Sequence, residues 1–516
     1  MEGSGRVQSC MPLLQSLHAH PDRKLYPHHA AHIVLPNALI GIGSTRRRTL
    51  EMDSFIKAVF PPEFPVQNIW YQGACTQIVF EKLPPEPWPI SVGGSIAFLR
   101  ETGSQEGITG SSENIMFPGG ERNSWTRNPI LSEIDGRKDI TTRRKFKDVA
   151  IKVYNFFRKN LPNYHLTHVL FTVQKCFLLF VSEEVVLCEL PGSIAGCFTY
   201  YYPDTMIPRP STKDLMMKRS KKPLPEARPP IIDNTIYATL RPGVLLCTAD
   251  VETPKKATEG PRMDIEAEND EEIHYAFNCS TTGVLVYHNS NPSKVYMTGS
   301  RHSMSEGDRH VWQPGEDMEE TFDNDANRFG TFNKNRDITF PGTDVCLVNI
   351  NDGVAFENIP FQNDDGAIPP LKDLVTPDDD FGNMVTFPLW LNSPYTGTLD
   401  GMLAAFGLAK NIMKKEGRSS EQAAMSAQTL KNQTGVDIDR ELIETTWMYH
   451  RTTAVAKIAK GMCGSAIVDG AGVVQGFYHA YCSEGPLKGL SYTVGAQFLA
   501  EKGYRLAPGN GAHPGS

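Results

Sequence analysis

Residues 461–469 read Gly461-Met462-Cys463-Gly464-Ser465-Ala466-Ile467-Val468-Asp469, and a turn at 470–472 and an apolar segment at 473–477 follow them. This order predicts a β-hairpin directly after the cysteine. Glycines on both sides of one nucleophilic side chain allow a sharp backbone turn and leave amide N–H groups free to bind an oxyanion. The pattern indicates acyl transfer at Cys463; the alternative is an inert buried thiol, because free cysteine is among the most buried residue types.

The stretch resembles the Gly-x-Ser-Gly-Gly/Ser-Pro motif of chymotrypsin-like peptidases, with Cys463 in place of the serine and Ala466 where proline is usual. A cysteine at this position also resembles the viral 3C-type proteases, which keep the two-barrel fold but use a thiol. The resemblance implies a peptidase acting on a protein or peptide, with the N–H groups of Gly461 and Cys463 as the oxyanion hole. It also implies a histidine and then an aspartate earlier in the chain.

A candidate histidine follows a predicted hairpin made by segments 282–287 and 294–298, which ends at Gly299-Ser300-Arg301-His302. The segment resembles the family's strand leading into Thr-Ala-Ala-His, with one additional residue and an arginine directly before the histidine. His302 is therefore the expected base, and His310, in a loop beside Trp312, is the alternative.

A candidate aspartate lies in 342–348, which resembles the family's Asp-Ile-Ala-Leu-Val strand. Asp344 is the expected acid, and Asp337 and Asp352 are the alternatives. In the mechanism that the resemblance implies, His302 takes the thiol proton of Cys463 and later protonates the leaving amine. Asp344 fixes the tautomer of the imidazole.

Two further residues near the nucleophile are candidates for substrate contact. Lys457 lies six residues before Cys463, where the floor of the family's specificity pocket often lies, and it would favour an acidic substrate residue if it is not a surface lysine. His479, on the strand after the nucleophile, is expected either to line the cleft or to cap the strand. Segment 489–499 resembles the family's last strand and C-terminal helix, so the resemblance covers about residues 233–508.

The fold class expected is multidomain α+β and all-β, with an N-terminal α+β domain followed by a chymotrypsin-like double β-barrel that carries a helical insert. The insert is predicted from an apolar stripe at 402–413. The expected divisions are a mobile arm at 1–52, a small α+β domain at 53–202, a Pro/Lys-rich linker at 203–232, the two-barrel domain at 233–508 and a disordered tail at 509–516. Within the α+β domain we expect a strand at 75–80, a helix at 146–157, and paired strands at 168–180 and 184–190.

Composition narrows the function classes. The 516 residues are 40% hydrophobic and 21% charged, and 51 basic against 59 acidic residues give a net charge of −8, so nucleic acid is not an indicated partner. No stretch approaches the roughly 20 apolar residues that cross a bilayer, so we expect no membrane partner and a cytoplasmic location. Ten cysteines without a CxxC pair predict reduced thiols and no metal site, and no phosphate-binding loop or other cofactor motif is present.

The sequence leaves two other functions open and does not predict the oligomeric state. One is a catalytically inactive scaffold of the same fold that binds proteins, which Arg301 beside His302 and the missing proline favour. The other is a non-peptidase hydrolase or acyltransferase on the same scaffold.

Overall fold

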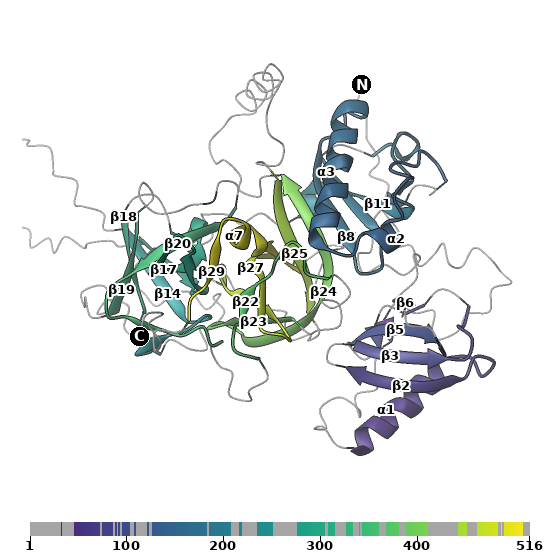
Figure 1. The fold of residues 1–516 in the computed structure, drawn as a ribbon, viewed down its shortest axis with the longest axis horizontal. Coiled ribbons are helices and arrows are strands. Elements are labelled where there is room, and N and C mark those ends of the chain that lie inside the picture. Colours follow the sequence, from purple (N-terminus) through teal and green to yellow (C-terminus); the bar gives the residue numbers. More distant parts are fainter. Residues whose placement is uncertain are drawn as a thin grey trace, which may run out of the picture.

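The computed structural model shows a mostly β-sheet protein with few helices (Figure 1). None of the helices in the described part of the chain is long and apolar enough to cross a membrane. The structure describes residues 32–33, 46–72, 75–85, 88–89, 91–92, 95–103, 108–109, 121–122, 126–182, 185–207, 216–218, 235–250, 276–304, 308–314, 327–333, 340, 343–360, 368–380, 389–410, 442–450, 462–482, 487 and 490–508.

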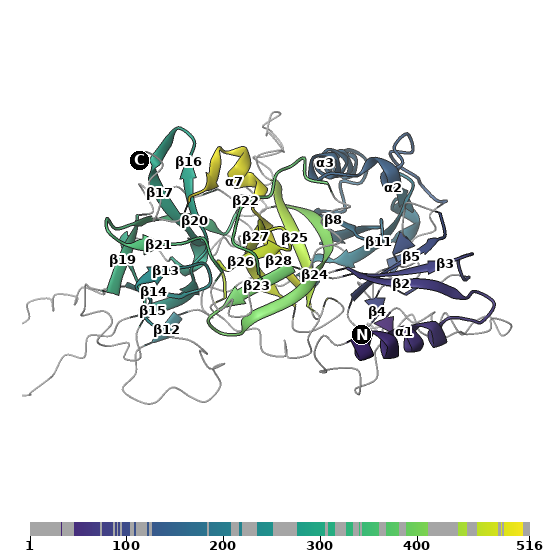
Figure 2. The same ribbon diagram turned by 60° about the horizontal axis from the view of Figure 1, so that its bottom comes forward.

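A six-stranded sheet with one helix forms the N-terminal unit, and the two lie side by side in both views (Figures 1 and 2). Its strand order is β1-β4-β5-β3-β2, with β6 on β5. Its own core contains Ile56 of the helix and Ile78, Phe80 and Leu99 of the sheet, because these apolar side chains face one another across the two layers. The bounds are β1 His32–Ile33, α1 Arg46–Val59, β2 Val66–Gln72, β3 Cys75–Phe80, β4 Ser91–Val92, β5 Ser95–Glu101 and β6 Ile108–Thr109.

A twelve-stranded sheet forms the centre of the molecule, and six of its strands close into a ring. The pairings run β23-β26-β27-β28-β25-β24 and return from β24 to β23. The ring strands are β23 Leu389–Ser393, β24 Gly397–Lys410, β25 Leu442–His450, β26 Ala466–Asp469, β27 Val473–Tyr481 and β28 Leu490–Gly495. The remaining strands are β7 Glu121–Arg122, β8 Leu166–Thr172, β9 Phe177–Val181, β10 Ser193–Ile194, β11 Cys197–Pro203 and β22 Asp373–Leu374.

A nine-stranded sheet lies beside this ring, with the order β12-β15-β14-β18-β19-β20-β17-β16-β29. Unlike the ring, its recorded pairings form an open path. The bounds are β12 Met216–Lys218, β14 Leu245–Asp250, β15 Ala276–Thr281, β16 Leu285–His288, β17 Asn291–Ser300, β18 Asp308–Trp312, β19 Arg328–Asn333, β20 Val345–Ile350 and β29 Tyr504–Leu506. A separate two-stranded sheet pairs β13 Thr239–Leu240 with β21 Ala355–Phe356.

The other helices are short except one. Thr142 caps α3 by accepting a hydrogen bond from the N–H of Lys145, and the apolar stripe of this helix packs over β8 and β24. The bounds are α2 Gly136–Asp139, α3 Arg143–Asn160 and α7 Gln497–Glu501, with 3₁₀ turns η5 Leu187–Glu189, η6 Asp204–Met206 and η8 Arg301–Ser303.

The predicted helix at 402–413 is wrong, because residues 402–410 belong to the long strand β24. This strand pairs on one side with β25 and on the other with β8, and residues 401–409 are buried without interruption. A strand covered on both faces needs an unbroken apolar run, and such a run also satisfies helical spacing. Residues 412 and 413 lie outside the described part.

The predicted division of the N-terminal half also differs from the structure. Strands β2 to β6, which lie between residues 66 and 109, form the six-stranded sheet together with β1, whereas β8 of the same expected domain pairs directly with β24 of the ring. The helix α1 begins at Arg46, inside the segment expected to be an arm. The strand at 75–80 and the helix at 146–157 are confirmed, but β8 and β9 form one hairpin within 166–181, and 187–189 is a 3₁₀ turn.

Candidate functional site

Two neighbouring strands of the nine-stranded sheet place a histidine beside an aspartate. The strand β17 ends at Ser300 and runs into the 3₁₀ turn that carries His302, while Asp344 directly precedes β20. Ser300 pairs with Val345, so the two strand ends meet. The N–H of Arg301 donates to the carbonyl of Asp344 at 2.7 Å, which fixes the approach of the backbones.

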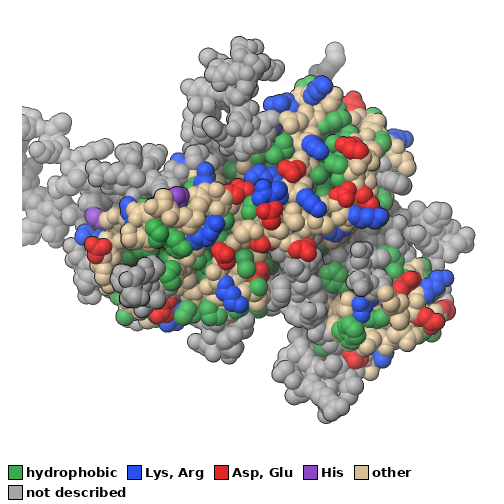
Figure 3. All heavy atoms as spheres, viewed as in Figure 1, with side chains coloured by type: hydrophobic (Ala, Val, Ile, Leu, Met, Phe, Trp, Pro, Cys, Tyr) green, Lys and Arg blue, Asp and Glu red, His purple; other side chains and the backbone are tan. Residues whose placement is uncertain are grey.

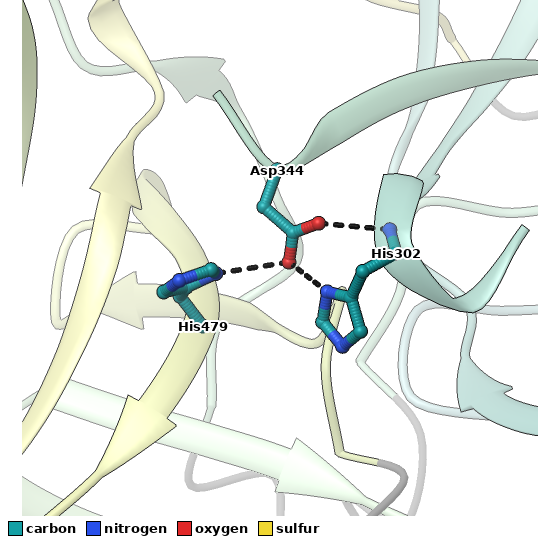
Figure 4. Close-up of side chains that lie close together, drawn as sticks. All are labelled: His302, Asp344 and His479. Atoms are coloured by element: carbon teal, nitrogen blue, oxygen red, sulfur yellow. Dashed lines mark hydrogen bonds and ion pairs between the residues drawn. The ribbon is translucent and has the colours of Figure 1, made fainter. Parts of the chain in front are cut away.

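The Asp344 carboxylate holds His302 at two points (Figure 4). One oxygen, Oδ1, accepts the backbone N–H of His302 at 2.9 Å, and Oδ2 bonds the imidazole Nδ1. The Ser300 hydroxyl lies 3.0 Å from the same Oδ2 and 2.9 Å from the same Nδ1. A proton on Nδ1 satisfies the carboxylate and leaves Nε2 free to act as a base.

Charge and burial shift the pKa values of this pair in opposite directions. Burial alone would lower the pKa of His302, but the charges of Asp344 and Cys463 and their hydrogen bonds outweigh it and raise the pKa well above 6.5. Burial alone would raise the pKa of Asp344, but the charge of His302 and the hydrogen bonds of His302 and His479 hold it far below 3.8. These shifts keep the Asp344 carboxylate ionised and stabilise the imidazolium that forms when Nε2 takes up a proton.

The turn before β26 presents Cys463, and the nine-stranded sheet holds this turn in place. The Cys463 carbonyl accepts the Ser280 hydroxyl at 2.7 Å and the Thr281 N–H at 3.3 Å. Gly464 follows with φ of +93°, and a Cβ there would lie 2.8 Å from the Thr281 oxygen. Only glycine meets both demands, so the turn is fitted closely against β15.

The Cys463 thiol lies near the imidazole of His302. A side-chain hydrogen bond to Cys463 is among the causes that raise the His302 pKa. The buried Nε2 atom nevertheless has no partner at ordinary hydrogen-bond distance among the described residues. The thiol–imidazole contact is thus longer or less well aligned than a normal hydrogen bond, as is common in a nucleophile–base pair without substrate.

One of the two expected oxyanion donors lies in the described part. The N–H of Cys463 makes no hydrogen bond to any described residue, whereas the N–H groups of Gly464 and Ser465 donate to the carbonyls of Tyr478 and Met462. The N–H of Cys463 is therefore available to a ligand. Gly461 lies outside the described residues.

His479 lies in a different environment from the one expected. Its imidazole is fully buried, and Nδ1 lies 2.9 Å from Oδ2 of Asp344, so the side chain has no exposed surface with which to line a cleft (Figure 4). Its carbonyl oxygen lies 3.5 Å from Sγ of Cys463. Lys457, the other residue expected to contact substrate, lies outside the described residues.

Two of the remaining alternatives for the base and the acid are exposed residues of other segments. His310 is exposed on β18 and stacks edge-on against Trp312, and Asp352 is exposed in a turn. Asp337 lies outside the described residues. Ser465 is fully buried two residues past Cys463. The sequence reasoning missed Ser300, although it is part of the segment that delivers His302.

His302, Asp344 and His479 are also the one group in the described part whose ligand atoms could hold a metal ion, lying within 4.8 Å of one another. Two imidazoles and a carboxylate are a common ligand set. In this structure the same atoms satisfy one another by hydrogen bonds. The three side chains are therefore held together by hydrogen bonds to the Asp344 carboxylate.

No protein-family model matches the chain. A comparison with curated proteins also finds no match.

Solved structures similar to part of the chain include three proteases. Protease A of Thermobifida fusca is 15% identical over 45% of this chain and 92% of its own, with a TM-score of 0.27. The Nocardiopsis protease is 13% identical over 44% and 92%, with a TM-score of 0.25. The chymotrypsin of Cellulomonas bogoriensis is 14% identical over 44% and 90%, with a TM-score of 0.26.

Proposed function

We propose that this protein is a peptidase with a chymotrypsin-like two-barrel domain, in which Cys463 is the nucleophile, His302 the base and Asp344 the orienting acid. The observation that carries the proposal is the position of the His302 ring. Asp344 binds its Nδ1, and the Cys463 thiol lies close enough to help raise the pKa of the ring. An acid, a base and a nucleophile in this order form the arrangement that cleaves acyl bonds by covalent catalysis.

The proposed reaction begins with transfer of the thiol proton from Cys463 to Nε2 of His302. The thiolate attacks the substrate carbonyl, and the backbone N–H of Cys463 binds the oxyanion, with Gly461 as the second donor. The imidazolium then protonates the leaving amine, and water releases the acyl group from sulfur with His302 again as the base. Asp344 stabilises the imidazolium throughout because its carboxylate stays ionised.

In this proposal His479 is a positioning residue. Its Nδ1–H donates to Asp344, which lies beside the other sheet, while its carbonyl contacts the sulfur of Cys463. One residue of β27 thus holds both the acid and the nucleophile. Its effect is to fix the position of Asp344, next to the nine-stranded sheet, relative to Cys463 of the turn before β26.

An electrophilic probe tests the nucleophile. A panel of peptidyl chloromethyl ketones should alkylate Cys463 in the full-length protein, as read by peptide mass mapping. We expect no adduct at position 463 in Cys463→Ala and much slower labelling in His302→Ala. Cys482→Ser is the matched control, because burial raises the pKa of that thiol to about 12 and makes it a poor nucleophile. An unchanged rate of Cys463 labelling in His302→Ala would contradict the proposed pairing of Cys463 with His302.

A peptide library tests the reaction itself. Cleavage products that appear with the wild-type protein and disappear in Cys463→Ala support a peptidase. Turnover of thioesters or esters without peptide cleavage would instead indicate an acyltransferase or a different hydrolase. Lys457→Glu should change which residue precedes the cleaved bond if Lys457 forms the specificity pocket.

The second candidate is a catalytically inactive scaffold that binds proteins. The observation that favours it is burial, since His302 is 7% exposed and Cys463 only 8%. A substrate carbonyl must reach the sulfur, so activity requires that the covering atoms move. Absence of both labelling and cleavage, with the fold intact, would favour this candidate.

A further inference from the structure

Two cysteines outside the proposed catalytic residues face each other on neighbouring strands. Cys247 of β14 and Cys279 of β15 occupy directly opposed positions in an antiparallel pair, and the two strands lie side by side (Figure 2). Their sulfur atoms are 2.8 Å apart. Directly opposed residues of an antiparallel pair have Cα atoms about 4.5 to 5.5 Å apart, which is within the range that a disulfide spans.

We propose that Cys247 and Cys279 are a dithiol site that is oxidised to a disulfide by a low-molecular-weight disulfide such as glutathione disulfide. A thiolate of the pair attacks the oxidant, forms a mixed disulfide and releases one glutathione thiolate. The second cysteine then attacks the protein sulfur of that mixed disulfide and releases the second glutathione. The two cysteines lose two electrons and two protons, and the oxidant gains them as two thiols.

The surroundings decide when this exchange takes place. Cys247 is fully buried and Cys279 is 3% exposed. Burial, followed by the contact with Cys279, raises the pKa of Cys247 well above its ordinary value, so little thiolate is present in the closed fold. The disulfide therefore forms while the chain folds or when the sheet opens locally, and the closed fold then protects it from reduction.

The site adjoins the proposed nucleophile without using it. The residues directly after Cys279 are Ser280 and Thr281, which hold the Cys463 carbonyl. Tyr395 lies in the turn between β23 and β24. Burial raises the pKa of its hydroxyl, and Cys279, Cys247 and Cys463 raise it further, so Tyr395 lies near all three thiols. A cross-link at this point ties β14 to β15, the strand that supports the turn at Cys463, so it restrains the part of the nine-stranded sheet that holds this turn.

Another buried thiol of the same sheet supplies the control. Cys346 lies in β20 of the same sheet and is also fully buried. Its sulfur contacts the carbonyl oxygen of Gly299 at 3.5 Å. It has the same burial as Cys247 but lies on a different strand, outside the β14–β15 pair.

The test is disulfide mapping of the full-length chain. The protein is incubated, and separately refolded from denaturant, in glutathione buffers of increasing oxidised fraction, and free thiols are then alkylated after denaturation. We expect a cross-linked peptide pair containing residues 247 and 279, which dithiothreitol reverses. Cys247→Ser and Cys279→Ser should abolish it, and Cys346→Ser should retain it.

Two further readouts keep the result separate from catalysis. The cross-link should form equally in a Cys463→Ser background, and the oxidised protein should unfold at a higher temperature than the reduced protein. Both cysteines remaining alkylatable after oxidative refolding would overturn the proposal, as would a cross-link between other cysteines. Neither result depends on whether the protein is a peptidase.

Discussion

Asp344 binds His302 through the imidazole and through the backbone N–H of the same residue, so one carboxylate sets both the position and the ring orientation of the histidine. The buried pair is supported from a third direction by Ser300. A side chain held in this way has little freedom to rotate, which is what a base aimed at a thiol requires.

The stability of the pair should depend on pH in a definite direction. The pKa of His302 is raised above 6.5, so its contribution to folding is complete below that value and is lost as the pH rises through the raised pKa. The pKa of Asp344 is lowered below 3.8, so its contribution is present above that value and lost as the pH falls through the lowered pKa. The free energy that the pair adds should be largest between about pH 4 and 6.5.

Urea unfolding of the wild type and of His302→Gln at a series of pH values measures the free energy that the His302–Asp344 pair adds to folding. The difference in unfolding free energy between the two should narrow as the solution becomes alkaline. A difference that widens toward alkaline pH would contradict the assignment. Cys463→Ser should lower the pKa of His302, because it removes the thiol that helps to raise that pKa.

Substitutions of His479 should separate positioning from packing. His479→Leu keeps much of the volume but leaves Asp344 without one donor, and loss of a hydrogen bond to a buried charge predicts a fall in kcat/KM of about 10- to 100-fold. His479→Asn is the matched variant, because its amide nitrogen lies near the place of Nδ1. His479→Asn should recover most of the lost kcat/KM, mainly through kcat. The pH dependence of its kcat/KM should match that of the wild type. Equal defects in both variants would indicate a packing role only.

The glycine after the nucleophile should tolerate no side chain. Gly464 and Gly353 both have positive φ, +93° and +84°, but a Cβ meets backbone atoms only at Gly464. Gly353→Ala should cost about 1 kcal/mol of unfolding free energy, the backbone term alone. Gly464→Ala should cost at least about 3 kcal/mol, because overlap with the Thr281 oxygen is added. Denaturant unfolding compares the two, and equal losses would refute the close fit of the turn against β15.

Alanine substitutions of two adjacent arginines should differ sharply in how much they destabilise the protein. Arg143 is buried against the ring, donates to Thr446 at 3.1 Å and to Gln475 at 2.7 Å, and lies over the ring of Phe406 at 4.1 Å. Burial lowers its pKa to about 10 despite the nearby carboxylates. Arg143→Ala should therefore destabilise the protein by about 3 kcal/mol or more, since it leaves polar groups unpaired beside a cavity.

Arg144 is the control for that variant. It is exposed and pairs with Asp378 at 2.7 Å. Acidic and basic side chains are interspersed on the face shown in Figure 3. Arg144→Ala should hardly change the thermal midpoint, because exposed ion pairs are weak. A large effect of both variants would mean that α3 is stabilised mainly by charge.

Local sequence patterns were sufficient to predict some elements of the fold. Alternation marked β3, helical spacing marked α3, and glycines around one thiol marked the turn at Cys463. These features depend on neighbours a few residues apart, so the chemistry of a short segment specifies them. The resemblance to the family's motifs named His302 and Asp344, which the structure brings into contact.

Contacts between segments distant in the sequence decided the features of the fold and the site that local patterns did not predict. The apolar run at 402–410 suits a helix or a strand, and only pairing with β8 and β25 makes it a strand. The attachment of β8 to the ring and the donation from His479 to Asp344 join residues more than a hundred positions apart. Such partners are chosen by burial and hydrogen bonding in the assembled fold, and no local pattern carries that information.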